Sequence, residues 1–412
     1  MSRKRQHQAG SALKYSTQEE RLLSIEDPTE SVYKAQTLQE WCIAHGETYT
    51  LVADGGAEVG RLFTGEKTYI SVFSPPLFFG RLSDTVILPE STFSCTADHK
   101  LVYQGLTHRD YAPSEDLGPF LVKNLGDDQY QLRIPDDMPV VEQECVFLGG
   151  RNNFGHFLNE GLMRWSVGKL IPYSDTLPVV IFRGLPRRFC EFLDLLDIPE
   201  ERRILIDPGV PTRFKRVWRV SSPLYMGHST AGTVPNWRPE CVRYFHDQIR
   251  SRALVQDSPP EATDRPILYL VRGSAGWRRV LNEAEVIDCV QRYGGRPVAV
   301  DSLSAKEQVQ LVGNARVLVS HAGAAPAISL FAPSDCVAVE CLPPTVSNLF
   351  GPIAYAGCLG QPYHRVLCRI STPEEVLAAG LSIDSSRIFP RDSDYFIDCA
   401  ALESILRSLP PG

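Results

Sequence analysis

The chain has 412 residues, of which 43% are apolar and 22% charged, and it carries a formal net charge of -7. This length and composition exclude a small disulfide scaffold and a largely disordered chain, and predict a soluble enzyme or binding protein of two or three domains. The negative charge argues against a nucleic-acid-binding protein, and the lack of an apolar run of about 18 residues argues against a membrane span.

The N-terminal region and the cysteines indicate the cellular compartment of the protein. Residues 1–30 are charged and aperiodic, so we expect a loose arm. The opening MSRKRQHQAG lacks the apolar stretch of a secretory signal, and the eleven cysteines form no C-x-x-C pair. We therefore expect reduced thiols in a cytoplasmic protein.

Basic residues gather between positions 183 and 219. A solvated surface is one interpretation, and a dock for an anionic membrane or a phosphate-bearing acceptor is the other. The second interpretation would make the protein membrane-peripheral. The residues concerned are Arg187, Arg188, Arg202, Arg203, Lys215 and Arg216.

The first domain is expected at residues 31–254. Strand-like segments separated by Gly, Pro and Asp turns make residues 33–130 β-rich. Beyond them, the spacing of apolar residues predicts alternating elements, as in an α/β fold. These are strands at 141–150, 177–182, 202–207 and 214–222, and helices beginning near 154, at 186–199 and at 239–254.

Residues 255–264 are rich in proline and polar residues and predict the linker between two domains. A second, Rossmann-like domain is expected at 265–390, because parallel strands alternating with helices need right-handed crossovers. Residues 391–412 are expected to form a C-terminal helix that packs back on either domain. The strands are predicted at 267–271, 296–300, 316–320 and 336–341, and the helices begin near 282, 305 and 324.

The strand ends of the second domain carry residues suited to a diphosphate. Ligands of open parallel sheets bind beyond the carboxyl ends of the strands. Arg272, Arg278 and Arg279 follow the first strand and can donate forked hydrogen bonds, to which the N-H groups of the helix after Gly323 would add. Glu340 ends the fourth strand, where it either binds a ribose or serves as a surface or capping residue.

The third strand ends at His321 and enters the small-residue run AGAA, which includes Ala324. Small residues here permit either the close approach of a ligand or tight packing of a helix on the sheet. His321 is accordingly either a hydrogen-bonded structural residue or a ligand contact. No G-x-G-x-x-G motif follows these strands, which counts against a dinucleotide oxidoreductase.

A second group of polar residues lies in GGRNNFGHFLNEGLMRW, residues 149–165. His156 and Glu160 are four residues apart, so they would share one face of a helix and either could act as a general base. The alternative is a helix cap with a satisfied histidine. Arg151, Asn153 and Asn159 lie beside them.

The acidic triplet at 392–394 and the pairs at 127–128 and 136–137 could suggest a metal site. They lie in turn-like sequence without an accompanying strand end, so we interpret them as solvated carboxylates and expect no metal.

These blocks resemble glycosyltransferase family 61. GGRNNFGHFLNEGLMRW resembles the family's first block, an Asn-aromatic-x-His-Phe segment followed by an acidic residue and an arginine. YLVRGSAGWRRVLNEAEV, LSAKEQVQLVGNARVLVSHAGAAPAISLFAP and CVAVECLPP resemble the second, and DSDYFIDCAALESIL the C-terminal segment. The sequence departs from the family where Ala325 follows GA in place of a second glycine.

The resemblance implies a GT-B fold, in which two Rossmann-like domains face each other across a cleft. It also implies a metal-independent, inverting transfer of a sugar from a nucleotide diphosphate donor, usually UDP-linked, to a glycan or lipid-linked acceptor. Carried over by position, His156 and Glu160 would face the acceptor, with Arg151, Asn153 and Asn159 beside them. The residues that would bind the donor are Arg272, Arg278 or Arg279, His321, Gly323, Ala324 and Glu340. A binding or scaffold protein without turnover is the alternative, which the alanine at position 325 would favour.

Overall fold

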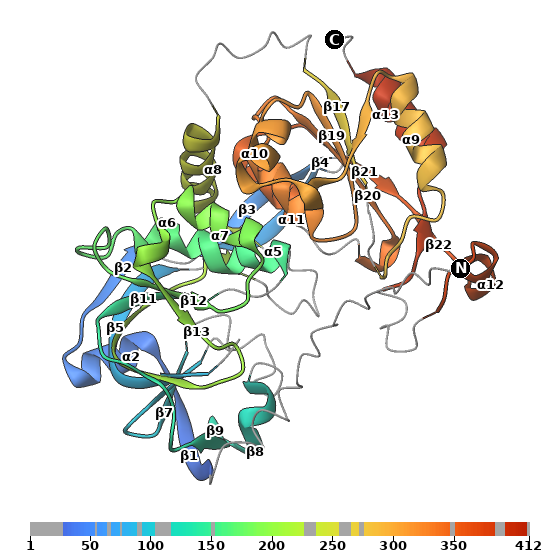
Figure 1. The fold of residues 1–412 in the computed structure, drawn as a ribbon. Coiled ribbons are helices and arrows are strands. Elements are labelled where there is room, and N and C mark those ends of the chain that lie inside the picture. The colour runs from blue at the N-terminus through green and yellow to red at the C-terminus, as the bar shows by residue number, and fades with distance from the viewer. Residues whose placement is uncertain are drawn as a thin grey trace, which may run out of the picture.

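The computed structural model (Figure 1) describes most of the chain. The expected N-terminal arm, apart from residues 28–30, and the expected linker at 255–264 lie outside the described residues. The described residues are 28–53, 56–63, 67–74, 76–88, 93–103, 117–149, 153–225, 236–254, 265–271, 276–346, 351–383 and 392–409.

The N-terminal half is built on a 12-stranded mixed sheet. Four of its strands, β13, β12, β11 and β14, are parallel to one another, whereas β14 pairs with β5 in the antiparallel sense. The β-rich character expected of residues 33–130 is confirmed. The strands in sheet order are β13 (Arg203–Ile206), β12 (Val179–Phe182), β11 (Cys145–Gly149), β14 (Thr212–Val220), β5 (Leu77–Ile87), β6 (Ser94–Thr96), β7 (Lys100–Tyr103), β1 (Pro28–Thr37), β9 (Gln129–Pro135) and β8 (Leu121–Gly126), with β10 (Val140–Val141) on β14 and β2 (Tyr49–Ala53) on β5.

Helices follow the parallel strands of this half. In α7, Phe189, Phe192 and Leu193 are buried at helical spacing, while the Arg187 side chain is 94% exposed on the opposite face. The helical elements are α2 (Leu38–His45), η1 (Gly118–Phe120), α5 (Phe154–His156), η2 (Phe157–Gly161), η3 (Leu162–Arg164), α6 (Trp165–Gly168), α7 (Arg187–Asp194), η4 (Glu200–Arg202) and α8 (Pro239–Ala253). Two hairpins complete it, β3 (Gly56–Phe63) with β4 (Lys67–Ser74) and β15 (Leu224–Tyr225) with β16 (Asn236–Trp237).

The C-terminal half contains a five-stranded sheet in the order β18-β17-β19-β20-β21, and every pairing in it is parallel. The prediction of alternating strands and helices is confirmed, but the sheet has one strand more than expected. The strands are β17 (Ile267–Leu270), β18 (Arg296–Val298), β19 (Val317–His321), β20 (Val337–Leu342) and β21 (Tyr363–Leu367), and β22 (Arg369–Ile370) pairs with β23 (Tyr395–Phe396).

Helices cover both faces of this sheet because side chains alternate along each strand. Val317 and Val319 pack towards α9 and α13, whereas Leu268 and Leu318 pack towards the opposite face. The last helix therefore packs on the C-terminal half. The helical elements are α9 (Glu283–Arg292), η6 (Val300–Ser302), α10 (Ala305–Gly313), η7 (Ala325–Phe331), η8 (Pro344–Val346), α11 (Gly351–Leu359), α12 (Pro373–Ala378) and α13 (Cys399–Ser408).

One hydrophobic core joins the two halves. Figure 1 shows α5, α6 and α7 between the N-terminal sheet and the C-terminal half. The ring centroids of Phe192 on α7 and Phe331 on η7 are 5.6 Å apart, and Phe245 on α8 packs on Phe331 at 5.8 Å. The chain is therefore a mixed α/β structure in which helices from both halves are buried between two sheets.

Candidate functional site

The turn after β19 holds three of the expected donor-binding residues. His321 is the last residue of β19 and is 1% exposed, Gly323 is exposed, and Ala324 is half-buried. The helix expected from about residue 324 is a 3-10 helix of seven residues, beginning at Ala325, so the expected α-helical N-terminus is absent. Its first turn closes with a hydrogen bond from Ala327 N to Ala324 O of 3.1 Å.

The segment containing His156 lies against this turn. A Cβ atom placed on Gly155 would lie 3.8 Å from the Cα of Ala324 and 3.9 Å from its Cβ. Gly155 belongs to α5, which follows β11, and Ala324 follows β19. The two groups of residues singled out in the sequence, about 170 positions apart, therefore meet in the fold.

The helix around His156 is irregular. Asn153 caps α5, and its Oδ1 accepts a hydrogen bond from His156 N at 3.3 Å. Directly after His156 the chain enters a π turn, a feature that frequently marks functional sites. The α-helical spacing that was expected to place His156 and Glu160 on one face does not continue through this turn, which corrects that expectation. His156 itself is half-buried.

Asn159 lies in the π turn and faces the C-terminal half. Its Oδ1 accepts a hydrogen bond from the hydroxyl of Tyr355, a fully buried residue of α11. The ring of Tyr355 also packs on Trp237 with centroids 5.2 Å apart. Asn159 therefore forms a hydrogen bond between the two halves, and the sequence around Tyr355 gave no signal of this contact.

Three of the expected site residues lie wholly or partly outside the described residues. Arg151 and Arg272 lie outside the described residues, and so does the side chain of Glu160. The strand that leads to Arg272 is nevertheless placed, because β17 pairs with β19 in the register Tyr269 to Val319. The loop that follows β17 thus begins beside the strand that ends at His321.

Arg278 and Arg279 both contact carboxylates. The guanidinium of Arg279 donates to Asp394 Oδ2 from Nε at 3.0 Å and from Nη2 at 2.6 Å, and Arg279 N donates to Asp394 Oδ1 at 2.7 Å. Nε of Arg278 lies 3.6 Å from Oδ1 of Asp392. Asp392 is 9% exposed and Asp394 2%, so the interpretation of this triplet as solvated loop carboxylates is wrong.

The acidic pairs at 127–128 and 136–137 are solvent-exposed, as expected. Asp127 and Asp128 are exposed and have positive φ values of 47° and 59°, and Asp136 and Asp137 are exposed. Within the described part of the chain, no cluster of three or more His, Cys, Asp or Glu side chains is arranged to hold a metal ion.

Glu340 lies within β20, which continues to Leu342, and its side chain is 3% exposed. The hydroxyl of Tyr363 donates to its Oε2 at 2.5 Å, and Nη2 of Arg365 lies 3.9 Å away. Burial raises the pKa of the Glu340 carboxyl to about 7, although Tyr363 and Arg365 lower it. Of the two interpretations of Glu340, the surface residue is therefore wrong, and the strand ends two residues later than expected.

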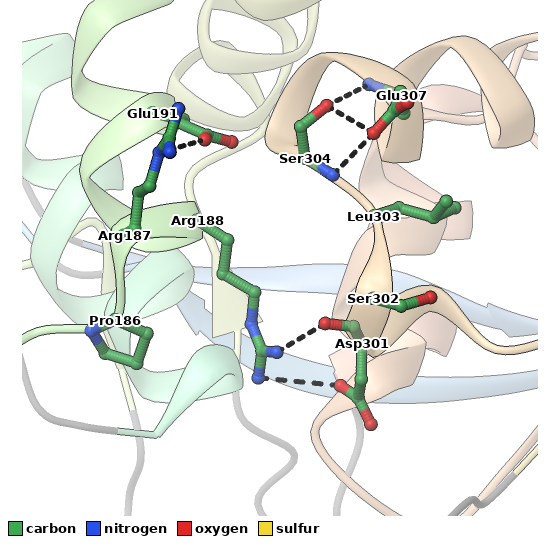
Figure 2. Close-up of a pocket in the computed structure, with 9 residues that line it drawn as sticks. All are labelled: Pro186, Arg187, Arg188, Glu191, Asp301, Ser302, Leu303, Ser304 and Glu307. Atoms are coloured by element: carbon green, nitrogen blue, oxygen red, sulfur yellow. Dashed lines mark hydrogen bonds and ion pairs between the residues drawn. The ribbon is translucent and has the colours of Figure 1, made fainter.

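A pocket of about 450 Å³ opens between α7 and the start of α10 (Figure 2). Nη1 of Arg188 donates to the carbonyl of Asp301 at 2.7 Å, and Glu191 Oε2 accepts from Ala305 N at 2.8 Å. The pocket follows the carboxyl ends of β12 in one half and β18 in the other. It is lined by Pro186, Arg187, Arg188, Glu191, Asp301, Ser302, Leu303, Ser304 and Glu307.

This lining contains two arginines and three carboxylates, so it does not form a positively charged dock. All six basic residues noted between positions 183 and 219 have partners within the chain. A membrane contact through them stays a prediction, and in the described residues no helix has the length and apolarity to cross a membrane. The pairs are Arg187 with Glu191, Arg188 with Asp301, Arg202 with the carbonyls of Ser174, Leu177 and Asp197, Arg203 with Asp194, Lys215 with Asp84, and Arg216 with Glu144.

Comparisons with solved structures find the dodecameric iron-containing heptosyltransferase TibC, solved in complex with ADP-D-beta-D-heptose. It is 14% identical to this chain with a TM-score of 0.28, over 66% of this chain and 75% of that one. Among curated proteins, no match is found.

The family model described as Glycosyltransferase 61 matches residues 154–339. The matched region begins at the first residue of α5 and ends in β20, so it contains both segments that meet at Gly155 and Ala324. It confirms the resemblance seen in the sequence and supports a glycosyltransferase. Residues 154–339 are thus similar to glycosyltransferase family 61, the family that the sequence blocks resemble.

Proposed function

We propose that this protein is an inverting glycosyltransferase of GT-B type that transfers a sugar from a UDP-linked donor to a hydroxyl of a glycan or lipid-linked acceptor. The observation that carries the proposal is the contact between Gly155 and Ala324. It brings a histidine-bearing segment that follows β11 beside a histidine-bearing turn that follows β19. Each segment lies at the carboxyl end of a parallel strand, where open α/β sheets bind ligands.

The pocket between the two halves supports the GT-B arrangement. In that fold, the carboxyl ends of two parallel sheets face a common cleft, and the lining of this pocket comes from the segments after β12 and after β18. The two halves proposed as domains, residues 31–254 and 265–390, would contribute the acceptor side and the donor side.

On the donor side, we assign the diphosphate to Arg272 and Arg278 with the turn at His321, Gly323 and Ala324. Arg279 is engaged with Asp394 on two guanidinium nitrogens, so its proposed part is to support this loop. Glu340 is proposed to accept from the ribose, beside Tyr363. Guanidinium groups held in place before the reaction stabilise the charge that develops on the leaving diphosphate.

On the acceptor side, the proposed chemistry is a single displacement. A base removes the acceptor hydroxyl proton while the oxygen forms a bond to the anomeric carbon and the bond from that carbon to the diphosphate oxygen breaks. His156 or Glu160 takes the proton. The proposal includes no metal and no cofactor beyond the sugar nucleotide. A cytoplasmic location is proposed because the eleven cysteines are free thiols, most of them buried.

Two substitutions test the assignment of roles. We expect His156→Ala to abolish hydrolysis or transfer of UDP-GlcNAc, UDP-xylose or UDP-arabinose while UDP affinity changes less than about twofold. Arg272→Ala should weaken UDP binding by about tenfold or more, because a charge-assisted pair with phosphate is lost. Calorimetric titration of UDP and a donor-hydrolysis assay measure the two effects.

His45→Ala in α2 and Arg292→Ala in α9 are the matched controls and should change neither quantity. Equal loss of UDP binding in the His156 and Arg272 variants would overturn the division of roles. UDP binding without turnover of any sugar nucleotide would favour the binding protein instead, for which the methyl group of Ala325 is the supporting feature. Failure to bind UDP, ADP or GDP would overturn the proposed function.

A further inference from the structure

We propose that Tyr395 is a positioning residue that fixes the donor-binding turn, residues 321–324, and that Asp394 fixes the arginine loop beside it, residues 278–281. Both belong to residues 392–397, which we call the C-terminal clasp. The inference rests on the proposed function, since it assumes that the turn after β19 receives the nucleotide diphosphate. The clasp lies about 70 positions after that turn in the sequence.

The first contact of the clasp is with the arginine loop. Asp394 is 2% exposed, and its carboxylate accepts from the backbone N-H and the guanidinium of Arg279 at 2.6 to 3.0 Å. Hydrogen bonds between ionised groups are stronger than neutral ones, and a buried pair is screened little by salt. The loop is therefore held at this point on both its backbone and its side chain.

The backbone of the clasp continues this attachment. Tyr395 N donates to Arg279 O at 3.0 Å, and Leu281 N donates to Tyr395 O at 2.9 Å. Tyr395 also forms a parallel β-bridge with Val280. Three consecutive residues of the loop are thus fixed to one residue of the clasp.

The clasp also holds Arg278 in an unfavourable backbone conformation. Arg278 has a φ of 52°, in the left-handed region that side chains other than glycine seldom adopt. Its N-H donates to Asp392 O at 3.3 Å, and its guanidinium lies beside the carboxylate of the same residue. Such a conformation persists where the surrounding contacts impose it, and it frequently occurs at ligand-binding sites.

The second contact of the clasp is with the turn itself. The hydroxyl oxygen of Tyr395 accepts a hydrogen bond from Ala322 N at 3.1 Å. Tyr395 is fully buried and Ala322 is 3% exposed, so no water replaces this bond at low cost. Ala322 is the residue between His321 and Gly323, and its peptide sets the direction in which the turn leaves β19.

One residue, Tyr395, therefore contacts both segments to which the donor diphosphate is assigned. The loop follows β17 and the turn follows β19, which are neighbouring strands. The clasp fixes their separation before any ligand arrives, and donors fixed in advance bind charge without the cost of ordering them.

The test compares Tyr395→Phe with Tyr293→Phe. Each variant removes one tyrosine hydroxyl from the same face of the C-terminal sheet. The hydroxyl of Tyr293 donates to Glu403 Oε1 at 3.1 Å, away from the turn. We expect Tyr395→Phe to weaken UDP binding by about tenfold in calorimetric titration, because a buried N-H loses its acceptor. Tyr293→Phe should leave UDP affinity unchanged, because its hydroxyl contacts neither the turn nor the arginine loop.

UDP affinity that is unchanged in both variants would overturn the proposal. An equal loss of UDP affinity in both variants would overturn it too, because either outcome fits a purely structural tyrosine. Asp394→Asn provides a second measurement with a side chain of the same shape, and it should weaken UDP binding because Arg279 loses its charged partner. If the unmodified protein binds no nucleoside diphosphate, the proposed function itself fails, which is a separate outcome from a failure of the clasp.

Discussion

The carboxyl of Glu340 shows how burial changes the chemistry of a single residue. Its Oε2 accepts a hydrogen bond from the Tyr363 hydroxyl and lies 3.9 Å from Nη2 of Arg365. These groups favour the charged form, but desolvation outweighs them and raises the pKa from 4.5 to about 7. Burial thus favours the protonated form of this carboxyl to a higher pH in the folded protein than in the unfolded chain.

This shift predicts a pH-dependent contribution to stability. Between pH 4.5 and 7 the folded state holds a proton on Glu340 that the unfolded state has released, so stability falls as the pH rises through this window. Glu340→Gln removes the titration. We expect its free energy of unfolding, relative to the unmodified protein, to rise by up to about 3 kcal/mol between pH 5 and pH 8 in urea titrations.

Glu374→Gln, on an exposed carboxylate of α12, is the control and should show a flat difference over the same window. A flat difference for Glu340→Gln as well would mean that its carboxyl titrates normally in the folded protein, and the burial argument would then be wrong.

Residue-scale contacts were the least predictable part of the site. The arginines after β17 were recognisable as donors, yet their carboxylate partners lie 115 positions away, as for Arg279 and Asp394. Local sequence around the acidic triplet resembles an exposed turn, and nothing in it indicates burial. Tyr355 and Tyr395 gave no signal because their contacts are with residues far away in the sequence.

At the scale of elements, the strands were predictable because their apolar runs are bounded by turn residues. The helix after His156 was not, since Phe157, Leu158, Leu162 and Trp165 fit a regular α-helix although the chain forms a π turn there. The helix α11 was missed because GPIAYAGCL is apolar on nearly every side, so it has no periodicity to detect.

The contact between α5 and η7 gives a prediction at this scale. A methyl group on Gly155 would meet Asn153 Oδ1 at 3.5 Å and Ala324 at 3.8 to 3.9 Å, which is ordinary van der Waals contact. We expect Gly155→Ala to bind UDP normally and Gly155→Leu to weaken binding by about tenfold or more, because the larger side chain must displace the turn. Calorimetric titration of UDP measures both.

Gly357→Leu is the matched control, since nothing lies within 4 Å of a Cβ at that glycine of α11. It should bind UDP as the unmodified protein does. Normal UDP binding by Gly155→Leu would show that the two segments are not required to meet for donor binding.

At the scale of the whole molecule, sequence predicted two α/β halves but not how they are joined. The proline-rich segment at 255–264 predicted a linker between two domains. The structure shows side chains of α7, α8, α10 and η7 in one hydrophobic core that continues from the N-terminal sheet to the C-terminal one. Periodicity reveals which face of a helix is apolar, but it does not reveal which sheet covers that face.

Because the two halves share one hydrophobic core, we expect them to unfold in a single cooperative transition. Phe331 is fully buried between Phe192 and Phe245 at 5.6 and 5.8 Å, so Phe331→Ala should destabilise both halves by about 3 to 5 kcal/mol. Differential scanning calorimetry should show one transition in the unmodified protein and one transition at lower Tm in the variant. Hydrogen exchange should show peptides of β12 and β19 losing protection together as denaturant is added. Two transitions, with only the C-terminal peptides affected by Phe331→Ala, would mean that the halves fold independently and that the interface between them opens without disturbing either core.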